Sequence, residues 1–272
     1  MNRWDWIYET NDAIYSAINA CWNEEDQRTH TWDENRITGD VLRAIGTSGT
    51  VHWEDKACSA SWRMFKAYGD YETANGDIAL NVTLCTQRGH VLAGVKHFEA
   101  KAACPDKKKY KAISRSQLGR MVGLVNHEVL LYSIQPVFKD HWWPGKPCPG
   151  AGSLPTELAL ALEPDGHTAL NANAVLFVRV LADALCGRGL DTNPKRVSAF
   201  QHELNRVDAR YVGAPRPIAP LQRPAFLMQA RVAIGANLEL RSDFTPPKAY
   251  RSLPEAAPPP DKPSGGSPSS RP

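Results

Sequence analysis

The chain has 272 residues, of which 42% are hydrophobic and 22% are charged, and its formal net charge is +3 at pH 7. This balance is typical of a globular protein and excludes fibrous and largely disordered classes, and the length supports a sizeable core. No apolar run reaches the roughly 20 residues that span a bilayer, and the N-terminus lacks the basic-then-apolar order of a signal peptide. We therefore expect a cytoplasmic protein with no membrane partner.

Two helices are predicted near the N-terminus. Residues 4–24 carry apolar side chains mostly three and four positions apart, which is the spacing of an amphipathic helix. The same spacing recurs over residues 34–45 and stops at Gly46, a residue type that is common at helix ends. Residues 51–70 hold aromatic and basic side chains without a clear period, so no element is predicted there.

Two adjoining strands are predicted next. An Asn-Gly turn precedes Asp77, and from Asp77 onward apolar side chains occupy every second position, as in a strand with one buried face. Residues 87–89 indicate a hairpin connection to a second strand over residues 90–102. Because side chains two positions apart share a face of a strand, we expect Glu99 and Lys101 to point the same way.

The remaining pattern mixes both kinds of element. Residues 114–128 predict a helix, 129–138 a buried strand, 173–185 a further helix and 225–234 a last strand. This order indicates an α/β fold with a mixed central sheet flanked by helices. We expect one domain over residues 1–244.

Residues 245–272 differ in composition from the rest of the chain. They contain nine of the 21 prolines and five serines, without apolar periodicity. Such a segment cannot bury enough apolar surface to offset the entropy lost on ordering. We expect a disordered tail, whose removal after Phe244 leaves the domain intact.

Positive charge is concentrated between Lys96 and Arg120, where eight Lys or Arg residues stand against two acidic ones. Such a cluster can neutralise nucleic-acid phosphates, although a lysine run after Pro-Asp is also typical of a solvated loop. The predicted contacts with nucleic acid are Lys107, Lys108, Lys109, Lys111 and Arg115.

Three residues of the two adjoining strands have the chemistry of a phosphodiesterase site. Hydrolysis of a phosphodiester needs a hard cation, an activated water and a nearby positive group, and two carboxylates at adjoining strand ends suffice to hold Mg²⁺. Asp77 and Glu99 can supply the carboxylates, and Lys101 the positive group. Each has an ordinary alternative: Asp77 as a turn residue, and Glu99 with Lys101 as a surface ion pair.

The order Gly76-Asp77, hairpin, then FEAK at residues 98–101 resembles the D…ExK half-motifs of the PD-(D/E)xK nuclease superfamily, with glycine in place of the signature's proline. The likeness covers about residues 30–190. It implies a restriction-endonuclease-like fold and cleavage that depends on Mg²⁺, with Mn²⁺ as a substitute. Asp77, Glu99 and Lys101 are then the catalytic residues.

The resemblance implies two further site residues. Many such nucleases have an acidic residue on an early core helix, which matches Glu34 here as a third metal ligand. Several also have a glutamine on the helix after the lysine strand, which matches Gln117. Glu34 could instead be a first-turn acid favoured by the helix dipole, and Gln117 a solvated helix residue.

The layout most resembles nuclease domains of bacterial restriction and anti-phage systems. This implies a DNA endonuclease that acts as an antiviral defence effector, with DNA, a partner defence protein and further copies of the chain as partners. Two alternatives stay open. One is a catalytically silent nuclease fold that binds nucleic acid or a protein. The other is an RNA-cleaving relative, because the site chemistry is the same until a 2′-hydroxyl must be read.

Overall fold

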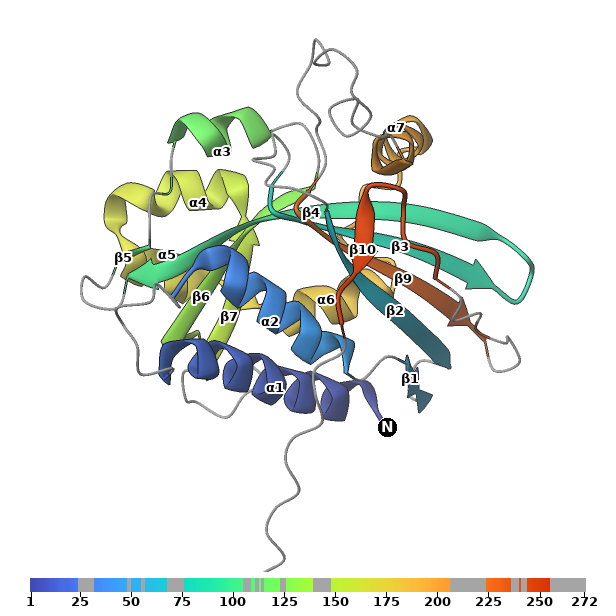
Figure 1. Cartoon of the computed structure of the whole chain (residues 1–272), viewed down its shortest axis with the longest axis horizontal. Coiled ribbons are helices and arrows are strands. Elements are labelled where there is room, and N and C mark those ends of the chain that lie inside the picture. Colours follow the sequence, from blue (N-terminus) through green and yellow to red (C-terminus); the bar gives the residue numbers. More distant parts are fainter. Residues whose placement is uncertain are drawn as a thin grey trace, which may run out of the picture.

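The computed structural model in Figure 1 has an α/β architecture, with a mixed sheet flanked by helices. It describes residues 1–23, 32–47, 50–54, 57–67, 76–104, 109–110, 113, 115–122, 126–138, 148–205, 224–235, 240 and 244–254. In these ranges, no helix is both long and apolar enough to cross a membrane.

The sheet has the strand order β1-β2-β9-β3-β4-β6-β7-β8, with β10 on β2 and β5 on the end of β4. It is mixed because β3 runs parallel to β9, and β4 parallel to β6, whereas the other pairs are antiparallel. The strands are β1 (Thr50–Trp53), β2 (Cys58–Ala67), β3 (Ile78–Thr86), β4 (Val91–Cys104), β5 (Lys109–Tyr110), β6 (His127–Phe138), β7 (Cys148–Pro155), β8 (Val175–Leu176), β9 (Phe226–Ile234) and β10 (Tyr250–Ser252).

Helices cover both faces of this sheet (Figure 1). The α-helices are α1 (Arg3–Asn23), α2 (Glu34–Gly46), α3 (Arg115–Met121), α4 (Thr156–Leu162), α5 (His167–Asn173), α6 (Phe177–Leu185) and α7 (Pro194–Asn205), and a short 3₁₀ helix, η2 (Glu163–Asp165), follows α4. On one face lie α1, α2 and α6, whereas α3, α4 and α7 lie on the other (Figure 1).

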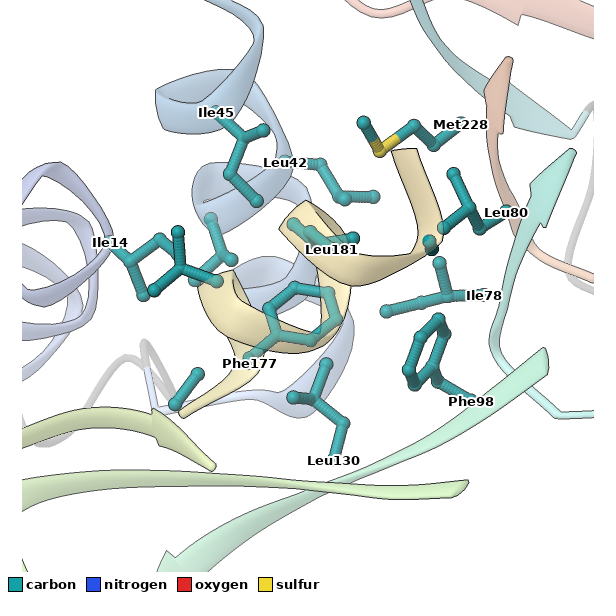
Figure 2. Packing of buried hydrophobic residues seen from close by; sticks show 14 of the residues in the cluster. Ile14, Leu42, Ile45, Ile78, Leu80, Phe98, Leu130, Phe177, Leu181 and Met228 are labelled. Atoms are coloured by element: carbon teal, nitrogen blue, oxygen red, sulfur yellow. The ribbon is translucent and has the colours of Figure 1, made fainter. Parts of the chain in front are cut away.

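The main core lies between the sheet and the α1, α2 and α6 helices. Figure 2 shows Phe177 and Leu181 of α6 between the side chains of α1 and α2 and those of the strands. The Phe177 ring meets Phe98 of β4 edge-on, with ring centroids 5.2 Å apart. Because Phe98 directly precedes Glu99, this packing helps to fix the part of β4 that carries the predicted site.

The predicted periodicities are confirmed for most of the regular elements. The helices predicted over 4–24 and 34–45 are α1 and α2, and α2 begins after Asp33, whose carboxylate accepts a hydrogen bond from the Arg36 N–H. The hairpin is β3–β4, although β3 begins at Ile78, one residue after Asp77. The predicted helix 114–128 is the shorter α3, and β6 and β9 follow as strands.

Other elements escaped prediction or were misplaced. The unassigned segment 51–70 contains most of β1 and all of β2. The helix predicted over 173–185 is α6, which ends at Leu185 as predicted but begins only at Phe177, because α5 ends at Asn173 and the two-residue β8 intervenes. The core also extends beyond residues 30–190, because α1 packs into it and β9 lies between β2 and β3 in the sheet.

The boundary predicted after Phe244 is wrong, because residues 245–254 belong to the fold. β10 pairs with β2 at Tyr250↔Ala67. Tyr250 is 2% exposed, and its hydroxyl donates to the Pro224 carbonyl at 2.7 Å. It joins a second core beneath α7, on the opposite face from the main core. The rest of the predicted tail, 255–272, lies outside the described residues.

Truncation after Phe244 should therefore destabilise the protein, because it removes the β10 ladder and the buried Tyr250. We expect the free energy of unfolding to fall by about 3 kcal/mol or more, the usual cost of deleting a buried aromatic side chain. Urea unfolding of the full chain and of chains ending at Phe244 or Pro254 measures this. The chain ending at Pro254 retains β10 and is the control. Equal stability of the two truncated chains would contradict the structural role of β10.

Candidate active site

The site lies where β4 continues past the start of β3. The two strands pair from Ile78↔Phe98, so the β4 residues after Phe98 extend beyond the start of β3 on that edge. Beyond the start of β3, two carboxylates replace its backbone as hydrogen-bond acceptors for β4. Asp77 Oδ2 accepts from the Ala100 N–H at 2.9 Å, and Glu34 Oε2 accepts from the Ala102 N–H at 3.1 Å. The backbone of β4 thus holds one oxygen of each carboxylate.

Lys101 lies among three acidic side chains. Its Nζ is 2.6 Å from Glu99 Oε1 and 3.5 Å from Glu34 Oε1. Gln117 of α3 donates its amide N–H to the same Glu99 oxygen. Glu99 and Lys101 therefore share a face of β4, as the two-residue alternation predicted. We call Glu34, Asp77, Glu99 and Lys101 the acidic cluster.

Burial makes the charge of this cluster costly. Glu99 is 1% exposed and Lys101 6%. Burial, reinforced by the Asp77 charge, raises the pKa of Glu99 to about 7 despite the opposing effect of Lys101. Burial also raises the pKa values of Glu34 and Asp77, against the effect of Lys101.

The ammonium group responds in the opposite sense. Burial alone would lower the pKa of Lys101, but the carboxylates of Glu99, Glu34 and Asp77 outweigh burial and raise it. Lys101 therefore stays charged while three carboxyl groups compete for it. When these are ionised, the cluster holds more negative than positive charge in a site that is largely removed from water.

All five residues predicted for the site come together: Glu34, Asp77, Glu99, Lys101 and Gln117. The alternative of a surface ion pair is wrong for Glu99 and Lys101, since both side chains are buried. The catalytic roles and the metal-ligand roles stay predictions. In the part of the chain that the structure describes, no group of three or more His, Cys, Asp and Glu side chains is placed to hold a metal ion.

Most of the residues predicted to contact nucleic acid lie outside the described part of the chain. Lys107, Lys108 and Lys111, and the side chain of Lys109, lie outside the described residues. Arg115, at the start of α3, is exposed and forms an ion pair with Glu163 at 3.3 Å. Such a surface pair contributes at most about 1 kcal/mol, so it leaves Arg115 able to meet a phosphate.

The basic cluster is also smaller than the sequence indicated. Lys96 is buried on the opposite face of β4 from Lys101, where its Nζ is 2.6 Å from Glu128 Oε1. Together with Lys101 in the acidic cluster, two of the eight counted charges are therefore compensated inside the protein. Only the other six can contribute to an external patch.

Two features of the site escaped the sequence analysis. The first is the pair of backbone N–H groups, Ala100 and Ala102, that fix Asp77 and Glu34. Alternation along β4 contained a signal for them, because every second N–H of a strand points to the same edge. The second is the conformation of Gly76, whose φ of +94° is open to few residues other than glycine.

Comparison with protein-family models, curated proteins and solved structures finds no match to this chain. The functional conclusion therefore depends on the geometry and chemistry of the site.

Proposed function

We propose that the chain is a metal-dependent nuclease that hydrolyses phosphodiester bonds of DNA at the acidic cluster. The observation that carries this proposal is the convergence of the cluster from distant parts of the chain. Glu34 and Lys101 are 67 residues apart in sequence, and Asp77 reaches the β4 backbone from the residue before β3. These are the residue types that phosphodiester hydrolysis requires.

The donor set suits a hard divalent cation. Glu34, Asp77 and Glu99 offer only carboxylate oxygens, the ligands that Mg²⁺ and Mn²⁺ prefer. A buried excess of negative charge is unfavourable, and a divalent cation would balance it. We infer that these three residues would hold Mg²⁺ or Mn²⁺, which supplies Lewis-acid stabilisation of phosphate charge and a more acidic bound water. Binding would require the side chains to turn from their contacts with Lys101.

The residues of the chain then have separate tasks. One carboxylate oxygen of Asp77 and one of Glu34 accept hydrogen bonds from the β4 backbone, which fixes the orientation of each carboxylate. The other oxygen of each would then be available as a metal ligand. Gln117 orients Glu99 through its amide. Lys101 supplies a positive charge next to the scissile phosphate, where negative charge builds up in the transition state.

The burial of the cluster favours an enzyme over a silent binding module. Three carboxyl groups with raised pKa values lower the stability of the fold, and departures of this kind are concentrated at functional sites. A module that only binds nucleic acid gains nothing from buried acids that repel phosphate. A role as an antiviral defence effector stays part of the proposal, supported by the resemblance of the D…ExK pattern to defence nucleases.

A plasmid assay tests the proposal directly. We expect the purified full chain to nick or linearise supercoiled plasmid in Mg²⁺ or Mn²⁺ and to leave it intact in EDTA. A structured RNA is the parallel substrate. Cleavage of RNA alone would favour the RNA-cleaving alternative, and binding of DNA without any cleavage would favour the silent module. The metal alone should also raise the melting temperature, since it binds the folded state only.

A further inference from the structure

The residue before Asp77 packs unusually close to the core of the site. Gly76 has φ +94°, and a Cβ atom there would lie 2.6 Å from the Phe98 carbonyl oxygen and 2.8 Å from His127 Nε2. Separations under 3.0 Å force something to shift. Proline, which the family signature has at this position, fixes φ near about −65° and cannot adopt this conformation.

The neighbours of Gly76 have little freedom to move. Phe98 belongs to β4 and pairs with Ile78 on one side and with Glu128 of β6 on the other. His127 is 6% exposed, and its Nδ1 lies 2.6 Å from the Thr156 hydroxyl at the start of α4. Thr156 is itself fully buried. A side chain at position 76 would therefore displace the 76–77 segment and leave β4 in place.

Such a displacement would act first on Asp77. The Asp77 carbonyl accepts from the Phe226 N–H at 2.9 Å, and its carboxylate accepts from the Ala100 N–H at the same distance. Both bonds depend on the close approach of this segment to the sheet. Moving it by about 1 Å would break them, and an error of that size in a reacting site can cost about 100-fold in rate.

We propose that Gly76 and His127 are positioning residues that seat Asp77 at the acidic cluster. Gly76 permits the close approach to Phe98, and the His127 ring, held by Thr156, forms the wall against which the segment rests. This inference deepens the proposed nuclease function, since the significance of Asp77 depends on it. Its structural content, the seating of Asp77 on Ala100, can be measured without any cleavage.

The test compares Gly76→Ala with Gly89→Ala. Gly89 also has positive φ, +77°, but it lies at the hairpin turn and a Cβ there meets nothing within 4 Å. Both substitutions strain the backbone, but only Gly76→Ala should lower kcat, by about 100-fold with little change in KM, because the error concerns a reacting group. Gly76→Ala should also weaken the rise in melting temperature caused by Mg²⁺ alone.

Thr156 supplies a second pair of variants in case Gly76→Ala fails to fold. Thr156→Val removes the hydroxyl that holds His127, and Thr156→Ser retains it. We expect Thr156→Val to lower kcat about tenfold or more, because His127 no longer positions the segment that carries Asp77. Thr156→Ser should keep kcat near the wild-type value. A purely structural role would lower the melting temperature of Thr156→Val without changing kcat at a temperature where the variant is folded, and that result would overturn the inference.

A direct measurement of the hydrogen bond between the Ala100 N–H and the Asp77 carboxylate tests this inference separately from the nuclease proposal. In ¹⁵N-alanine-labelled protein, the Ala100 amide proton should resonate downfield because it donates to a carboxylate, and Ala100→Gly identifies its peak. The peak should move upfield in Asp77→Ala, Gly76→Ala and Thr156→Val, and stay in place in Gly89→Ala and Thr156→Ser. Unmoved peaks in Gly76→Ala and Thr156→Val would refute the inference, whether or not the protein cleaves DNA.

Discussion

Asp77→Asn and Glu99→Gln should each abolish metal-dependent cleavage while leaving the fold intact. Each substitution keeps the shape of the side chain and removes the negative charge that a divalent cation needs. Loss of a metal ligand removes several kcal/mol of transition-state stabilisation, so we expect at least about a 1000-fold fall in rate. Plasmid cleavage in Mg²⁺ and the melting temperature with and without Mg²⁺ measure the two effects.

Glu99→Gln should be more stable than the wild-type chain, which distinguishes loss of a metal ligand from damage to the fold. Glu99 is buried beside other acids, so removing its charge relieves repulsion. In EDTA we expect Glu99→Gln to be more stable than the wild-type chain, by on the order of 1 kcal/mol. The rise in melting temperature caused by Mg²⁺ should disappear.

A matched control comes from Glu128, a carboxylate that also pairs with a lysine of β4 but lies outside the acidic cluster. Glu128→Gln should lower stability, because Lys96 loses its partner, and should keep both the Mg²⁺ response and cleavage. If Asp77→Asn or Glu99→Gln still cut plasmid at the wild-type rate, the assignment of the site is wrong.

Lys101→Met should have the second large effect, on rate and on stability together. In the metal-free protein the Lys101 ammonium is the positive charge next to Glu99 and Glu34. Removing one member of a buried charged group leaves the others uncompensated, which costs about 3–5 kcal/mol. We therefore expect a marked fall in melting temperature in EDTA, and substantial recovery in Mg²⁺, whose charge replaces that of the ammonium.

The rate should not recover with the stability. Mg²⁺ can balance the carboxylates, but it leaves the transition state without the lysine charge, so most of kcat should be lost while DNA binding in Ca²⁺ is kept. Lys96→Met is the matched control, because Lys96 is also buried and paired with a glutamate. It should lose stability in EDTA without recovery in Mg²⁺. Equal loss of DNA binding and rate in Lys101→Met would make Lys101 a binding residue.

Sequence alone determined the α/β class and most of the strands beside the site. The alternation of apolar side chains in β3 and β4 and the apolar runs of β6 and β9 are local properties, so these strands could be recognised without knowing their neighbours. The same alternation placed Glu99 and Lys101 on one face. By contrast, β7 has the sequence CPGAGSLP, which looks like a loop. Its Gly152 is needed because a Cβ there would clash with the Phe138 ring, a requirement that only packing reveals.

The segment after Phe244 shows the same limit. Its proline content indicates disorder, yet Tyr250 finds a buried site beneath α7 and a strand partner in β2. Composition predicts how much apolar surface a segment carries, but a single aromatic side chain can be enough when a cavity of the right shape already exists. That site is formed by parts of the chain that are distant in sequence, from Phe65 of β2 to Phe200 of α7.

For the acidic cluster too, the sequence indicated some features and only the tertiary structure decided the others. Residue types and spacing along the chain suggested that Asp77 and Glu99 belong together, the family resemblance added Glu34, and the alternation of β4 set the direction of Glu99. Only the tertiary structure decided that Glu99 is buried and the other two are partly buried, that β4 backbone N–H groups hold two of the three, and that Lys101 lies among them. Burial and contacts over such sequence distances arise from how the sheet and helices pack, and local pattern does not encode them.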